Sequence, residues 1–136
     1  MTDPETSAPG HVRVHVRLEE ATALQNPERL TKGDWTFRIF AGDVERWQST
    51  DELHIGRGET KRVGAEFQVD VPAESDHIKL RVEAAEKDIL SNDDMATGQT
   101  MLYRSQGFGS TMPVLMDVTG DNAHLRLKFT GRTEPM

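Results

Sequence analysis

The sequence contains no cysteine. It therefore has no disulfide framework, no thiolate ligand for a metal and no cysteine nucleophile. Aromatic residues make up only 6%, which makes a carbohydrate-binding surface built from aromatic platforms the weakest functional hypothesis. The purely apolar runs are only a few residues long, too short to span a bilayer. The 136 residues nevertheless suffice to bury one sizeable core, so we expect a single globular domain.

Acidic residues outnumber basic ones, with 23 aspartates and glutamates against 16 lysines and arginines. The formal net charge is −7 at pH 7, and the isoelectric point is near 5.2. Such a surface has little attraction for nucleic acid or anionic lipid, because both require clustered lysine and arginine. No nucleic-acid partner is expected. If the protein meets a phosphate or a membrane, a divalent cation must first reverse the charge locally.

The first ten residues also lack the features of a secretory signal. They are polar, with two prolines and two acids, and have neither a basic start nor an apolar stretch. We expect residues 1–10 to form a disordered leader. Together with the missing cysteines, this favours the cytoplasm as the location.

Alternation of apolar and polar residues with a period of two is the dominant pattern, and it is typical of half-buried strands. It is strict from His11 to Leu18, where the valines and the leucine share one side. Further strands are predicted by the same criterion over 36–40, 66–71, 78–84 and 125–129, and weaker candidates over 45–49, 53–55, 100–103 and 113–118.

Turn-forming segments rich in glycine, proline and aspartate separate these strands. No segment of helical length keeps apolar residues at spacings of three and four, although a turn of helix could form within 19–30. The pattern predicts an all-β fold, an antiparallel β-sandwich of about eight strands in one domain. We expect the sandwich to cover residues 11–131 and residues 132–136 to form a frayed tail.

Acidic residues gather in two predicted loops. Glu28 and Asp34 stand six residues apart, with Asp34 directly before a strand, and Glu86, Asp88 and Asp94 follow the strand over 78–84. Loops that follow strands running the same way can lie side by side at one end of a sandwich. Carboxylates gathered there repel unless a cation offsets them. Flexible loops with hard oxygen ligands suit calcium, which takes about six to eight oxygens.

The same residues carry a resemblance to the C2 domains, the calcium- and phospholipid-binding sandwiches. The segment 32–39, KGDWTFRI, resembles the family's Gly/Ser-Asp-Pro-Tyr-Val stretch, and Asp94 followed by Gly98 resembles its closing Asp-x-x-Gly. The resemblance extends over about 12–131. It implies five calcium ligands at the family's spacing: Glu28, Asp34, Glu86, Asp88 and Asp94.

Ile89 and Leu90 are adjacent apolar residues within the second acidic loop. In C2-like membrane binders this loop often carries apolar residues that enter the lipid interface, so the resemblance implies that these two contact a membrane. The alternative is that both fold back as a small satellite cluster or that one simply lies exposed. Likewise, the five acids could be solvated loop residues of an acidic protein.

Other polar groups point less clearly to a site. His11 and His15 share one strand face with Arg13 and Arg17, and without a third ligand an exposed face is the better interpretation than a metal site. No nucleophile motif or phosphate-binding loop is present, so no enzyme is expected.

Two functional hypotheses remain. In the first, a C2-like domain in the cytoplasm attaches peripherally to an anionic phospholipid membrane through calcium at its acidic loops. In the second, a calcium-independent sandwich serves as a protein-interaction or assembly subunit, and the acidic loops are incidental.

Overall fold

A computed structural model describes residues 10–25, 32–86, 95–120 and 123–136. Strands dominate these residues, and the all-β prediction is confirmed. Every segment that alternates in the sequence forms a strand, the weaker candidates included. The elements are β1 (Val12–Gln25), β2 (Lys32–Ala41), β3 (Val44–Gln48), β4 (Leu53–Gly56), β5 (Thr60–Val71), β6 (His77–Glu86), β7 (Met95–Tyr103), a 3₁₀ helix η1 (Arg104–Gly109), β8 (Val114–Thr119) and β9 (His124–Pro135).

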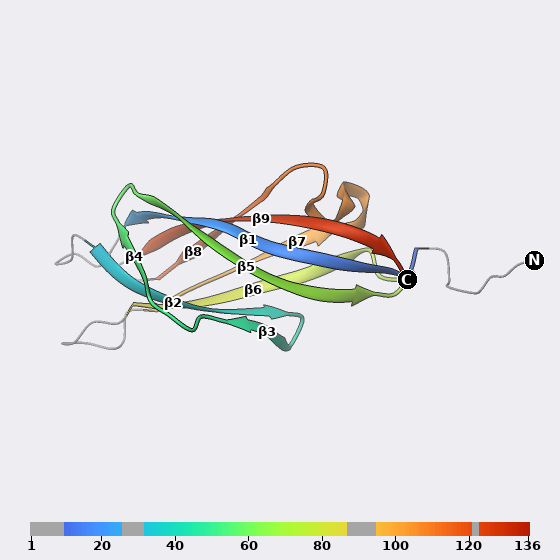
Figure 1. The fold of residues 1–136 in the computed structure, drawn as a ribbon, viewed down its shortest axis with the longest axis horizontal. Helices are drawn as coiled ribbons and strands as arrows, with labels where there is room; N and C mark the ends of the chain where they lie inside the picture. The colour runs from blue at the N-terminus through green and yellow to red at the C-terminus, as the bar shows by residue number, and fades with distance from the viewer. Residues whose placement is uncertain (1–9, 26–31, 87–94, 121–122) are drawn as a thin grey trace, which may run out of the picture.

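All the strand pairs are antiparallel, and the strands follow the order β3-β2-β6-β7-β8-β9-β1-β5, with β4 paired to β2. One pair of residues, Thr97 and Thr119, joins β7 to β8. The sheet folds back at this weak junction, so its two halves face each other across the core (Figure 1). The predicted sandwich is therefore present as two halves of one nearly closed sheet.

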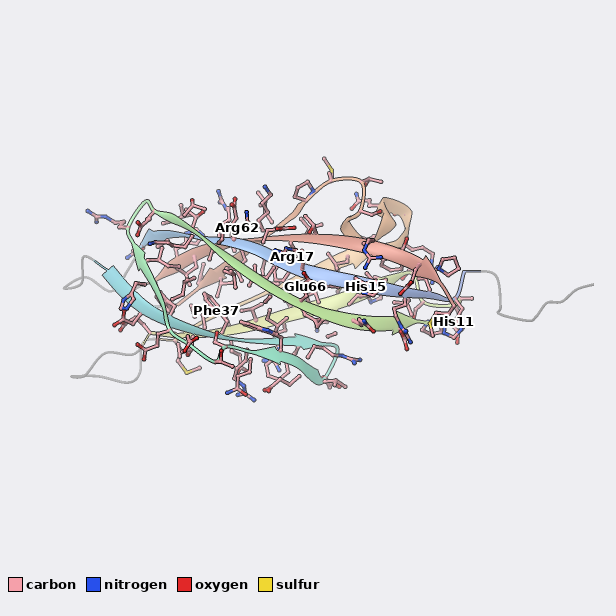
Figure 2. All side chains as sticks on the ribbon, viewed as in Figure 1. His11, His15, Arg17, Phe37, Arg62 and Glu66 are labelled. Carbon is pink, nitrogen blue, oxygen red and sulfur yellow. The ribbon has the colours of Figure 1, made fainter. Side chains whose placement is uncertain are left out.

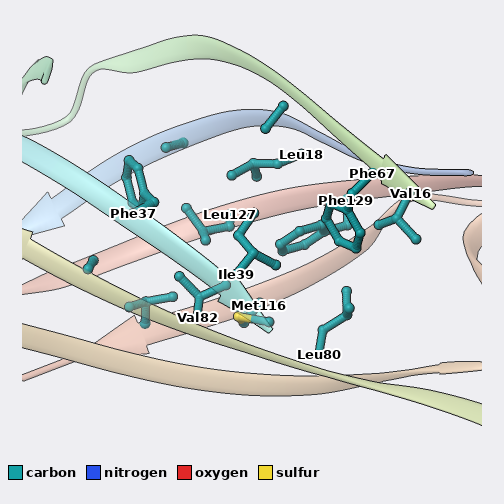
Figure 3. Close-up of a cluster of buried hydrophobic side chains, with 14 of the residues drawn as sticks. Val16, Leu18, Phe37, Ile39, Phe67, Leu80, Val82, Met116, Leu127 and Phe129 are labelled. Atoms are coloured by element: carbon teal, nitrogen blue, oxygen red, sulfur yellow. The ribbon is translucent and has the colours of Figure 1, made fainter. Parts of the chain in front are cut away.

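The core lies between these halves, as the alternation requires. Each strand turns every second side chain inward, and these side chains are almost fully buried. Phe37 and Ile39 of β2 meet Leu18 of β1 and Leu127 and Phe129 of β9 (Figure 3). Trp35 is also completely buried. This packing fixes the two halves against each other and thus the positions of the strand ends.

Two predictions about irregular segments are corrected. Residues 19–25, where a turn of helix was considered, continue β1. Residues 132–135, predicted to belong to a frayed tail, belong to β9 and pair with β1, with Arg132 opposite His15 and Pro135 opposite Val12. In both cases a long neighbouring strand supplies hydrogen-bond partners that the local sequence does not reveal.

A bulge interrupts the pairing of β1 with β5. The register passes from Leu18↔Ala65 to Glu20↔Arg62, so Glu19 faces two residues of β5, and the second of these, Gly64, has a φ of +71°. Glycine adopts this left-handed conformation without the Cβ clash that other residues meet. The bulge allows Glu19 and Glu20, neighbours in sequence, both to stay partly exposed.

Arg104, the first residue of η1, ties together the end of the molecule opposite the ends of β1 and β6. Its guanidinium donates hydrogen bonds to the carbonyl oxygens of Ser75, at 2.8 and 3.0 Å, of Pro72, at 2.8 Å, and of Gly10. It also lies 5.2 Å from the ring centroid of Phe108, which is buried with a φ of +54°. We call this the clamped end. In the part of the chain that the structure describes, no helix is long and apolar enough to cross a membrane.

Candidate functional site

The strands that border the two acidic segments end at the same end of the molecule. The last residue of β6, Glu86, pairs with Trp35 near the start of β2, and the last residue of β1, Gln25, pairs with the first residue of β9. The strand ends that border segments 26–31 and 87–94 thus lie at one end of the sandwich (Figure 1). The predicted site residues of these segments lie outside the described residues: Glu28, Asp88, Ile89, Leu90 and Asp94.

The two predicted ligands that are described, Asp34 and Glu86, lie together. The backbone amide of Asp34 donates a hydrogen bond to Oε2 of Glu86, with an N···O distance of 3.1 Å. Glu86 is only 3% exposed, whereas the side chain of Asp34 is 34% exposed. We call this the acidic end. Residues 52 positions apart in the sequence thus meet at one edge of the sheet, through the backbone of one and the carboxylate of the other.

His54 completes this edge from a third strand. It lies directly opposite Asp34 in the β2–β4 pairing, and its Nδ1 forms an ion pair with Oδ1 of Asp34. The imidazole is 67% exposed. Asp34 therefore has a nitrogen partner already, and any ligand that approaches its Oδ1 must compete with this exposed ring.

The described residues do not by themselves complete a metal site. Among them, no group of three or more histidine or acidic side chains is arranged to hold an ion. Asp34 and Glu86 supply hard carboxylate oxygens, which fit calcium better than a soft metal. These two carboxylates are thus of the kind that calcium binds, and the other predicted ligands, Glu28, Asp88 and Asp94, lie outside the described residues.

Exposed apolar side chains border the same segments. Leu24, near the end of β1, is 37% exposed, and Met95, the first residue of β7, is 50% exposed. Met95 pairs with Ala85, next to Glu86. The acidic end thus combines carboxylates with apolar side chains on the strands that flank them.

Sequence reasoning missed His54, Leu24 and Met95. The strand over 53–55 was predicted, but nothing in the sequence fixes its register against β2, so the pairing of His54 with Asp34 could not be found. The apolar residues could have been found, because each is a large hydrophobic next to an acidic loop. Only the apolar residues inside the second loop were predicted to contact a membrane.

The other candidate groups lie elsewhere. His15 is on an outward strand face, as predicted, and its Nε2 lies 2.6 Å from Oε1 of Glu134. Phe108 of η1 is buried in the core, and its backbone is left-handed there, with a φ of +54°. Tyr103 is 45% exposed and lies beside the ring of His77.

Comparison with known proteins was informative at the level of structure alone. No family model matches the sequence, and no curated protein matches it. Solved structures do match over nearly the whole chain. A C2 domain-containing protein is 18% identical, with 98% of this chain and 96% of that chain covered and a TM-score of 0.56.

Two further solved structures support the same fold. A C2 domain of plant Extended Synaptotagmin 1 is 12% identical, with 95% of this chain and 98% of that chain covered and a TM-score of 0.58. Human GIVD cytosolic phospholipase A2 is 13% identical, with 98% of this chain but 17% of that chain covered and a TM-score of 0.59. The chain therefore matches whole C2 domains and only a small part of the phospholipase.

Proposed function

We propose that this chain, which has the fold of the C2 domains, is a binding domain that docks on anionic phospholipid through calcium held at its acidic end. The observation that carries the proposal is the 3.1 Å hydrogen bond between the amide of Asp34 and the carboxylate of Glu86, at strand ends that border both acidic segments. The proposed role is binding without catalysis, at a membrane that the protein meets peripherally from the cytoplasm.

The proposed ligands are the carboxylates of Glu28, Asp34, Glu86, Asp88 and Asp94. Glu86 has two roles in this proposal. Its Oε2 accepts a hydrogen bond from the amide of Asp34 and so fixes the start of β2. Its carboxylate also binds the cation. A carboxylate has about four lone-pair positions, so one hydrogen bond does not exhaust it. When bound, calcium would supply the positive charge that a lipid phosphate recognises.

The chain's own residues would do the rest. Asp34 would exchange its contact with His54 for the cation, and the exposed ring of His54 leaves room for this. Leu24 and Met95 would bury apolar surface at the lipid interface together with Ile89 and Leu90. Each such side chain contributes about 1.5–3 kcal/mol when fully buried, and less when it is partly buried already.

Co-sedimentation with vesicles of phosphatidylserine and phosphatidylcholine tests the proposal. The natural protein should sediment with calcium and be released by a chelator. Asp34→Asn should weaken the calcium-dependent binding at least tenfold, because the carboxylate charge is lost at the site. The matched control is Asp43→Asn, which removes the same charge from the exposed turn at the other end of β2 and should change little.

Two results would contradict the proposal. Equal losses in both variants would mean that overall charge, and not the acidic end, controls binding. A protein that ignores vesicles with and without calcium, yet elutes as a larger assembly in size exclusion, would favour the assembly-subunit hypothesis.

A further inference from the structure

The outer face of the half-sheet formed by β5, β1, β9 and β8 is densely charged. Side chains at every second position along these strands point away from the core, and several can be followed along β1 and β5 in Figure 2. We call this the charge-balanced face, because its basic and acidic residues are equal in number. The basic residues are Arg13, Arg17, Arg62, Arg126, Lys128 and Arg132, and the acidic residues are Glu19, Glu20, Glu66, Asp70, Asp117 and Glu134.

Ion pairs between strands hold most of these charges in place. Arg13 of β1 lies 2.8 Å from Asp70 of β5, and Arg17 pairs with Glu66 across the same strands and with Glu19 at 3.0 Å. Within the described residues, Arg62 and Arg132 have no ion pair. Two basic groups of the face are thus available to an outside anion.

Three of the five histidines lie on this face. His11 and His15 stand on or beside β1, and His124 is the first residue of β9. Histidine is the side chain that gains a proton between about pH 5 and 8. Protonation of these rings would add positive charge to a face on which the other charges already cancel.

Charged groups of three strands surround His15. Its Nε2 lies 2.6 Å from Glu134 of β9, and Arg132 is directly opposite on the same strand. Gln68 is its partner on β5, flanked by Glu66 and Asp70. On β1 itself, Arg13 and Arg17 stand on either side. Glu134 thus contacts the ring, and the two acids on β5 are paired with Arg13 and Arg17.

His124 has a similar environment. Its Nε2 lies 3.0 Å from Oδ1 of Asp117 on β8, which also accepts a hydrogen bond from Nε of Arg126 at 3.0 Å. Its direct partners are Thr119 on β8 and Gln25 on β1, both uncharged. The hydrogen bond from Arg13 lowers the pKa of Asp70, and His11, next to β1, makes a smaller contribution in the same direction.

The carboxylates beside the rings stay charged in acid. The hydrogen bond with His15 lowers the pKa of Glu134, and the bond with His124, followed by that with Arg126, lowers the pKa of Asp117. An ordinary imidazole gains its proton at a higher pH than an ordinary carboxylate does, and the two carboxylates beside the rings have lowered pKa values. The face therefore acquires net positive charge without first losing the acids that hold the rings in place.

We propose that the charge-balanced face is an acid-activated docking surface for an anionic lipid bilayer, independent of calcium. A protein partner fits less well, because protein interfaces have an apolar centre. The exposed large hydrophobics on the described strands of this face are Leu24 and Leu115, at 37% and 57% exposure and on different strands. A broad charged face without an apolar centre suits an anionic membrane, which attracts each nearby basic charge by about 1 kcal/mol, or about fivefold in binding.

The experiment measures co-sedimentation with phosphatidylserine and phosphatidylcholine vesicles at low salt with chelator throughout, at about pH 7.5 and about pH 5.5. The natural protein should bind at least about tenfold more strongly at the lower pH. The triple variant His11→Gln, His15→Gln, His124→Gln should lose that gain. The matched control is His54→Gln with His77→Gln, which removes the two histidines that lie elsewhere and should keep most of it.

A second variant removes acidic charges from the face in place of the histidines. Glu134→Gln with Asp117→Asn leaves the face positive at neutral pH, so this protein should bind the vesicles at about pH 7.5 without acidification. It supports or contradicts the proposal even if the triple variant fails to fold.

Three results would overturn the proposal. The natural protein could show no gain on acidification, the control could lose as much as the triple variant, or binding could be equal on vesicles of phosphatidylcholine alone. Binding to an acidic polypeptide but not to vesicles would also overturn it, in favour of a protein partner. Because chelator is present throughout, failure here leaves the calcium proposal untouched.

Discussion

The two ends of the sandwich use their polar groups in different ways. At the clamped end, Arg104 donates hydrogen bonds to backbone carbonyls of two separate segments, Gly10 and the turn 72–75. At the acidic end, Asp34 and Glu86 come together where strands stop, and the partner of Asp34 is an exposed histidine. We infer that the clamped end holds the strands together, whereas the acidic end exposes charged side chains.

The largest expected difference between the ends is in the cost of losing an apolar side chain. Phe108→Ala at the clamped end should lower the free energy of unfolding by about 3–5 kcal/mol, because a fully buried ring is lost. Met95→Ala at the acidic end should change it by less than about 0.5 kcal/mol, because Met95 is half exposed. Urea unfolding measures both. Similar losses would mean that the acidic end also carries the stability of the fold.

A smaller loss of unfolding free energy is expected when Arg104 is replaced. Arg104→Met keeps much of the side chain's packing but removes its hydrogen bonds to the carbonyls, and it should cost about 2 kcal/mol. Arg126→Met is the control, because its ion pair with Asp117 is half exposed and worth at most about 1 kcal/mol. If the control costs as much as the clamp variant, the carbonyl contacts do not hold that end together.

The smallest expected effect is the stabilisation of the protein by calcium at the acidic end. If calcium binds the native acidic end, a free concentration of about ten times its dissociation constant should stabilise the protein by about 1.4 kcal/mol. Thermal melting should therefore shift upward with calcium. Asp34→Asn should remove this shift, and Arg104→Met should keep it on a lower baseline. A melt that calcium leaves unchanged would count against the site.

The fold was largely predictable from the sequence, because a strand with one face in the core must alternate. The segments 12–18, 66–71 and 125–129 form strands for this reason. The sequence could not show where strands lie relative to one another. His54 meets Asp34, and Arg104 meets Gly10, only because of the register and the packing of distant segments.

The candidate site was predictable in part. Glu86, at the end of β6, meets the backbone of Asp34, near the start of β2, because the two strands are antiparallel neighbours. That these carboxylates bind calcium with Glu28, Asp88 and Asp94 stays a prediction. So does the contact of Ile89 and Leu90 with a membrane.

The paired strands β1 and β9 connect the clamped end of the molecule with its acidic end. The amide of Met136 donates to the carbonyl oxygen of His11 at 3.2 Å, so both strands reach the clamped end together (Figure 1). From there, the 14 residues of β1 run to the acidic end, a length of about 45 Å at the usual rise of a strand. A fluorophore attached at Met136 would thus stand well above a bilayer touched by the acidic end. It would lie much nearer to one covered by the charge-balanced face, so energy transfer to labelled lipid distinguishes upright from flat attachment.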